Sequence, residues 1–150
     1  MHEPALASIA AVMDALYACI SGVAGAPRDW TRFRALFYPG ARLVPTRRNP
    51  EGAPGAEVFD VDGYIASRSP YFAENDFFEQ EIACQTFRFG HIAHVLSAYE
   101  ARRRPGGEIL WRGINCIQLL DDGRRWWIVS ILWDNERPDN PMPAWTRTAP

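Results

Sequence analysis

The chain has 150 residues, of which 47% are hydrophobic and 23% are charged, as expected for one globular domain with a single core. The net charge of −2 excludes the electrostatic footprint of a nucleic-acid-binding protein, and no run approaches the roughly 18 apolar residues of a membrane helix. Cys19, Cys84 and Cys116 are odd in number and lie in apolar surroundings, which predicts reduced thiols and a cytoplasmic location.

Two helices are predicted in the first 40 residues. Apolar residues at helical spacing predict the first helix over about residues 5–21. A shorter helix begins near Asp29 and ends at Pro39-Gly40. Its Trp30 is either a core residue or an aromatic side chain that lines a pocket.

The segment that follows is less regular. Residues 42–45 predict a short strand, and residues 46–56 predict either a mobile surface loop or a lid, because this stretch is rich in proline and glycine. Asp60 is a suitable N-cap for a third helix that extends to about residue 67 and carries Tyr64, a second candidate ligand contact. Pro70 is expected to interrupt that helix.

Four consecutive strands are predicted in the second half of the chain. They extend over residues 77–89, 92–102, about 109–121 and about 124–134, with turns at Gly90, at 105–107 and at Asp122-Gly123. Helices followed by an antiparallel meander indicate an α+β fold. The domain is expected to cover residues 1–136, and a proline-rich arm residues 137–150, with Trp145 as its anchor.

The last hairpin is the most informative stretch. Asp122-Gly123 between two apolar runs predicts a two-residue turn. That turn would place Leu119 opposite Trp126 and Asn115 opposite Ser130. Both faces of the hairpin are then largely apolar, so both must be covered. The helices of the same chain can cover one face, and a second copy of the protein can cover the other.

These patterns resemble the nuclear transport factor 2-like superfamily, whose cystatin-like α+β fold is shared with SnoaL-like polyketide cyclases, steroid isomerases and scytalone dehydratase. Within it, the chain is most similar to the uncharacterised bacterial members. The stretches that carry the resemblance are the stripe from Leu6 to Ile20, Trp30 with Phe33 and Leu36-Phe37, the strand 90–95, and Asp122-Gly123-Arg124-Arg125-Trp126-Trp127-Ile128-Val129.

The resemblance implies a cone-shaped, curved antiparallel sheet wrapped around three N-terminal helices. The sheet would comprise the long four-strand meander and the short N-terminal strand. The family also implies an apolar pocket in the concave face and a homodimer through the outer face. No complete catalytic set of the family's enzymes can be matched to this sequence residue by residue.

Trp126 and Ile128 resemble the inward-facing pair of the family's last strand, so their face is expected to be concave. A register that pairs Ser97 with Asn115 and Tyr99 with Gly113 adds further side chains to that face. The candidate polar lining of the pocket is Ser97, Tyr99, Asn115 and Ser130. These four side chains either contact a ligand or satisfy one another within the core.

The opposite face is expected to form the dimer interface. Its members would be Arg112, Trp127, Val129, Ile131 and Trp133. His94 would lie on the same face as an interface or structural histidine; if the two faces were inverted, it would become the best general acid or base in the chain.

No metal site or cofactor is expected. His91 and His94 are separated by three positions, which places them on opposite faces of a strand, and no ligand-spaced cysteine or carboxylate accompanies them. The expected function is a homodimer that binds a small apolar molecule with a polar group, with isomerase, dehydratase or cyclase activity. The alternative is a non-catalytic structural or association module whose own side chains fill the cavity.

Overall fold

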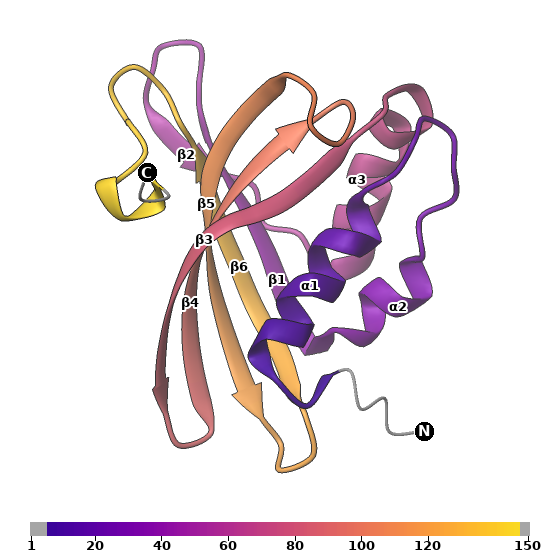
Figure 1. Cartoon of the computed structure of the whole chain (residues 1–150), viewed down its shortest axis with the longest axis vertical. Helices are drawn as coiled ribbons and strands as arrows, with labels where there is room; N and C mark the ends of the chain where they lie inside the picture. The colour runs from indigo at the N-terminus through magenta and orange to yellow at the C-terminus, as the bar shows by residue number, and fades with distance from the viewer. Residues whose placement is uncertain (1–5, 148–150) are drawn as a thin grey trace.

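The computed structural model describes residues 6–147. Three helices lie on one side of a curved sheet of six strands (Figure 1). The helices are α1 (Ile9–Ile20), α2 (Trp30–Ala35) and α3 (Val61–Glu74). The strands are β1 (Phe37–Arg48), β2 (Pro54–Ala56), β3 (Phe78–Phe89), β4 (Ile92–Arg102), β5 (Ile109–Asp121) and β6 (Trp126–Asn135). The predicted α+β class is therefore confirmed.

The sheet has the strand order β2-β1-β6-β5-β4-β3. Strands β3 to β6 form the expected antiparallel meander, but β1 runs parallel to β6, so the sheet is mixed. β1 is also longer than the predicted strand over residues 42–45. Helix α2 ends at Ala35, before Pro39-Gly40, so the predicted helix end was wrong. Pro39-Gly40 instead lies at an irregularity inside β1, where Gly40 takes the positive φ of 86° that favours glycine.

Residues 46–56 form a hairpin, so the expected loop or lid was wrong. Thr46 pairs with Ala56 and Arg48 with Pro54 across β1 and β2. The turn is closed by Asn49, whose side-chain oxygen accepts a hydrogen bond from the backbone N–H of Ala53 at 2.8 Å. The Asn49 side chain satisfies a backbone N–H within the turn, and this hydrogen bond stabilises the polar, glycine-containing turn between β1 and β2.

Helix α3 is longer than the sequence predicts. Asp60 is its N-cap, as expected, and accepts a hydrogen bond from the N–H of Gly63 at 2.7 Å. The helix then continues through Pro70 to Glu74, because the proline removes one backbone donor without ending the other helical bonds. The extension is important for the site, since it makes Arg68 a helical residue.

The register of the β5–β6 hairpin differs from the prediction in two ways. The loop has four residues, because Asp121 pairs with Trp126, and Asp122 Oδ1 accepts hydrogen bonds from the N–H groups of Arg124 and Arg125 at 2.9 Å. A β-bulge then inserts Val129 between the pairs Leu119–Ile128 and Gln118–Ser130. An extra residue in one strand exchanges the two faces beyond it, so the predicted faces are wrong from Ser130 onward.

The concave side of the sheet packs on the helices, and the other side carries a short C-terminal element. The core includes Val12 and Leu16 of α1, Val95 of β4, Ile117 of β5 and Ile128 of β6, all of which are buried. The 3₁₀ helix η2 (Ala144–Thr146) packs against β3 on the side away from the helices (Figure 1). Within residues 6–147, no helix has the length and apolar character needed to cross a membrane.

Candidate ligand-binding site

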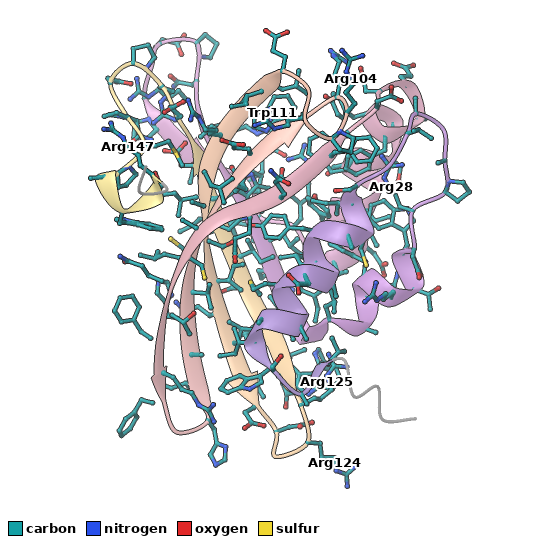
Figure 2. All side chains as sticks on the ribbon, viewed as in Figure 1. Arg28, Arg104, Trp111, Arg124, Arg125 and Arg147 are labelled. Atoms are coloured by element: carbon teal, nitrogen blue, oxygen red, sulfur yellow. The ribbon has the colours of Figure 1, made fainter. Side chains whose placement is uncertain are left out.

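A cavity of about 380 Å³ lies between the helices and the concave face of the sheet. Its apolar wall includes Leu16, Ile20, Phe33, Leu43, Ile131 and Trp133. Trp111 also lines it, and Figure 2 shows this residue at the end of the sheet opposite to Arg124 and Arg125. The cavity therefore lies towards the end away from the β5–β6 turn. Its volume is within the range of about 300–1,000 Å³ that is usual for ligand pockets.

Helix α3 contributes one side of the cavity. Tyr64, Arg68 and Phe72 are spaced by four residues, which places them on the same face of the helix, and all three line the cavity. Arg68 is half-buried, and its guanidinium carbon lies 5.5 Å from the ring centroid of Tyr64. Burial raises the pKa of Tyr64 to about 12, so this phenol stays neutral at physiological pH.

Glu79 of β3 is the only carboxylate among the lining residues within the described part of the chain. It is half-buried, and it lines the cavity. Removal from water raises the pKa of Glu79 to about 8, although the nearby charge of Arg68 opposes the increase. At neutral pH most molecules therefore carry a neutral carboxylic acid at this position, with a smaller ionised fraction.

Four side chains form a directional chain of hydrogen bonds that runs from the cavity lining, at Asn115 and Tyr17, to Ser97 and Glu81 behind it. Ser97 donates to Glu81 at 2.5 Å, and the Ser97 and Tyr17 hydroxyls are 2.6 Å apart. Because the single Ser97 proton is used by Glu81, Tyr17 must donate to Ser97. Tyr17 in turn accepts from the Asn115 amide nitrogen at 3.0 Å. The chain holds the Asn115 amide through its nitrogen, and the amide oxygen keeps its capacity to accept a hydrogen bond; Asn115 lines the cavity.

Tyr99 is held by a separate hydrogen bond. Its hydroxyl donates to the side-chain oxygen of Asn135 at 2.7 Å, and both residues line the cavity. Burial is the main reason that the pKa of Tyr99 is raised above its ordinary value, and the nearby Glu79 adds to the increase. The Tyr99 oxygen is thus a neutral group whose proton is engaged by Asn135 and whose lone pair can accept a hydrogen bond.

Comparison with known proteins relates this architecture to other chains by structure. No family model and no curated protein matches the sequence. An NTF-2 like protein of unknown function from Silicibacter pomeroyi has a TM-score of 0.58 and 20% identity, covering 85% of this chain and 92% of its own. The chain has the nuclear transport factor 2-like fold. The resemblance inferred from the sequence is thus confirmed at the level of the fold.

Two further structures have the same nuclear transport factor 2-like architecture. A cystatin-like protein of unknown function from Nostoc punctiforme has a TM-score of 0.65 and 8% identity, covering 87% of this chain and 90% of its own. A protein provisionally assigned as a ketosteroid isomerase, from Shewanella frigidimarina, has a TM-score of 0.53 and 13% identity, with coverages of 82% and 91%. At these identities the comparisons show the fold alone.

The nuclear transport factor 2-like fold brings some of the predicted ligand contacts together and separates others. Tyr64, Tyr99 and Asn115 line the cavity, and the predicted pairing of Ser97 with Asn115 and of Tyr99 with Gly113 is confirmed. Ser97 is fully buried behind the lining, where it contacts Tyr17 and Glu81.

Trp30 and Ser130 are not among the lining residues. Trp30 packs edge-on against Phe33, with ring centroids 5.3 Å apart, outside this cavity. Ser130 follows the bulge in β6, which turns its side chain to the outer face; its predicted inward position was wrong. Ligand binding by any of the six predicted contact residues stays a prediction.

The bulge also reverses part of the predicted dimer interface. Ile131 and Trp133 line the cavity, so their expected outward position was wrong. Arg112 and Trp127 lie on the outer face, and Val129 is the extra, half-buried residue of the bulge. Arg112 of β5 lies opposite Glu100 of β4, and the two charged groups are 3.9 Å apart.

His94 lies on the outer face of β4. Its ring nitrogen Nδ1 is 2.5 Å from the side-chain nitrogen of Gln118 on β5, and the cavity lining contains no histidine within the described residues. The predicted face assignment holds in β4 and β5, where Val95, Tyr99 and Ile117 point to the concave side. His94 therefore points away from the cavity and cannot act as its acid or base. Within residues 6–147, no three His, Cys, Asp or Glu side chains come together to hold a metal ion.

Sequence reasoning missed Glu79 and Arg68. The alternation of Phe77 and Glu79 was a usable signal, because it places a carboxylate two residues after a buried aromatic residue on the same face. For Arg68 the signal was the spacing of four from Tyr64 and from Phe72, but ending the helix at residue 67 hid it.

Proposed function

We propose that this chain forms a homodimer that binds a small, mostly apolar molecule with a polar group, and that Glu79 moves a proton on the bound molecule. The reaction would be that of an isomerase, a dehydratase or a cyclase. The observation that carries the proposal is a carboxyl group with a pKa of about 8 in the wall of an otherwise largely apolar cavity. Strongly perturbed groups in clefts are typical of acid–base catalysts.

The neighbours of Glu79 support a role in proton transfer. A pKa near 8 leaves both protonation states populated around neutral pH, so the group can both donate and accept a proton. The Asn115 amide is held by its nitrogen, which donates to the Tyr17 hydroxyl, and the Tyr99 hydroxyl is held by donating to Asn135. Fixed polar groups of this kind orient a ligand without having to rearrange when it binds.

The alternative, a non-catalytic module with a self-filled concavity, has less support. The side chains around the concave face leave a cavity of about 380 Å³, and a module that serves only for association has no need of a carboxylic acid in the wall of that cavity. The cytoplasmic location expected from the cysteines stays a prediction.

The homodimer is proposed because apolar side chains are exposed on the outer face of the sheet. Phe87, Phe89 and Ile92, at the end of the β3–β4 hairpin, are 58%, 83% and 62% exposed, and Leu132 on β6 is 44% exposed. Clustered apolar side chains of this size are typical of an association surface. A second copy of the chain is the occupant that we propose.

Two measurements test the proposed activity. A thermal-shift screen of small hydrophobic ketones, phenols and acids identifies compounds that raise the melting temperature. Proton NMR in deuterated buffer then measures exchange of the carbon-bound protons next to the carbonyl group of a stabilising ketone. We expect the wild type to accelerate exchange and Glu79→Gln to lower the rate by about a hundredfold, the usual contribution of a general acid or base.

The matched control is Glu108→Gln, because Glu108 is exposed and outside the cavity. This variant should exchange protons at the wild-type rate. If no compound stabilises the wild type, the cavity is not a ligand site. If compounds bind but no exchange depends on Glu79, the protein binds ligands without this proton transfer.

A further inference from the structure

The charges around the cavity do not balance at neutral pH. In the part of the chain that the structure describes, its charged lining residues are Arg47, Arg68 and Glu79. Arg47 lies 3.4 Å from Glu57, whereas no ion pair within residues 6–147 joins Arg68 to a carboxylate. Glu79 keeps its proton up to a pKa of about 8, so the positive charge of Arg68 is not neutralised.

The position of Arg68 is unusual for a residue that only serves solubility. It occupies the cavity-facing stripe of α3 between Tyr64 and Phe72. Its guanidinium interacts with the Tyr64 side chain and lies 5.5 Å from the ring centroid. A half-buried charge is costly to keep unless a partner compensates it. By contrast, Arg34 on α2 is exposed and pairs with Asp62 at 2.7 Å.

We propose that Arg68 binds the carboxylate of the ligand, so that the cavity takes a small monocarboxylic acid with an apolar, aromatic body. This inference rests on the proposed function, because it identifies the polar group of the same ligand. The planar guanidinium matches a carboxylate with two parallel hydrogen bonds. One arginine balances one negative charge, whereas a phosphate group would bring a charge of about −1.5 to −2.

The surrounding rings suit an aromatic body. Tyr64 and Trp133 meet edge to face, with centroids 6.0 Å apart, and both line the cavity. A carboxylate on Arg68 would lie beside the Tyr64 ring, in the cavity that Glu79 and Tyr99 also line.

Matched pairs of compounds test the inference by isothermal titration calorimetry at pH 7. The probes are benzoate, 3-phenylpropionate and naphthalene-2-carboxylate, each compared with its primary amide. We expect the wild type to bind at least one acid at least tenfold more tightly than its amide. Arg68→Met should remove this preference and keep the amide affinity, and Arg68→Lys should retain part of it. Arg34→Met, the control outside the cavity, should behave as the wild type.

Each outcome supports or overturns one of the two proposals. If an acid and its amide bind the wild type equally, the carboxylate inference is overturned and the cavity remains a ligand site. A preference that survives in Arg68→Met overturns the role of Arg68. If neither acids nor amides bind the wild type, the proposed function fails together with the inference. The wild-type comparison needs no variant, so the test holds even if Arg68→Met does not fold.

Discussion

Tyr99 of β4 lies directly across Gly113 of β5, and the two residues are paired in register. A Cβ atom at position 113 would collide with the Tyr99 hydroxyl oxygen and with the backbone carbonyl oxygen of Asp134. The absence of a side chain at Gly113 is therefore what allows the Tyr99 phenol to reach Asn135 beside the cavity.

Gly113→Ala should lower stability and displace Tyr99. Overpacking at a close contact usually costs about 1–3 kcal/mol, and here one of the two colliding atoms belongs to the backbone and cannot rotate away. Urea denaturation measures the change. Gly55→Ala is the control, because the nearest atom to its added Cβ would be 3.9 Å away. Equal stability of the two variants would contradict the close approach of Tyr99.

Tyr17→Phe should destabilise the protein by about 1–3 kcal/mol, because it removes the hydroxyl between Asn115 and Ser97 and leaves buried polar groups without a partner. Tyr38→Phe is the matched control, since Tyr38 is 42% exposed and its ring packs on Trp127 at 6.0 Å. Thermal unfolding of both variants decides the point. A loss in Tyr38→Phe as large as that in Tyr17→Phe would argue against a buried chain of hydrogen bonds.

The sequence was sufficient for the helix order, the meander and the β4–β5 register, because turn residues bracket those strands. It was not sufficient for the β5–β6 register. The strand from Trp126 to Trp133 is largely apolar on both faces, so a register shift of one residue does not change its hydrophobic pattern. The bulge at Val129 therefore could not be predicted from the sequence. The side chain of Asp122 also stabilises a four-residue loop through Arg124 and Arg125, where the Asp-Gly signal favours two.

The candidate site was predictable only in part, for two physical reasons. Asn115 and Tyr99 followed from one strand register, whereas Glu79 needed a second register, which another bulge between Glu81 and Ala83 disrupts. Arg68 depended on whether α3 crosses Pro70, and a proline in a helix is decided by the packing of the whole helix rather than by its neighbours in sequence.

The exposed apolar side chains on the outer face of the sheet should make the chain a homodimer. Sedimentation of the wild type should give about twice the mass of the chain, and Phe89→Lys should give a monomer, because Phe89 is 83% exposed and a charge there would be buried by a second copy. Val58→Lys is the control, since Val58 is 67% exposed and lies in the segment before α3, outside β3, β4 and β6. A wild-type monomer at micromolar concentration, or a dimer that is insensitive to Phe89→Lys, would contradict the proposed interface.

Glu79 should make the stability of the protein depend on pH. In the unfolded chain its carboxyl loses its proton near the ordinary pKa of 4.5, whereas in the folded chain the proton is held up to about 8. Between these two values the unfolded state binds fewer protons, so an increase in pH favours unfolding. The stabilising contribution of the neutral carboxyl is thus complete below about pH 4.5 and lost as the pH rises through about 8.

Glu79→Gln removes this dependence, because the amide does not titrate. The charged and titratable side chains that face Glu79 are Arg68 and Tyr64 of α3, Tyr17 of α1 and Tyr99 of β4, and the raised pKa values of the three tyrosines keep them neutral over this range. We expect the melting temperature of Glu79→Gln, relative to the wild type, to increase steadily from pH 5 to pH 8.5. Glu108→Gln should show no such trend, and a constant difference between Glu79→Gln and wild type would contradict the raised pKa of Glu79.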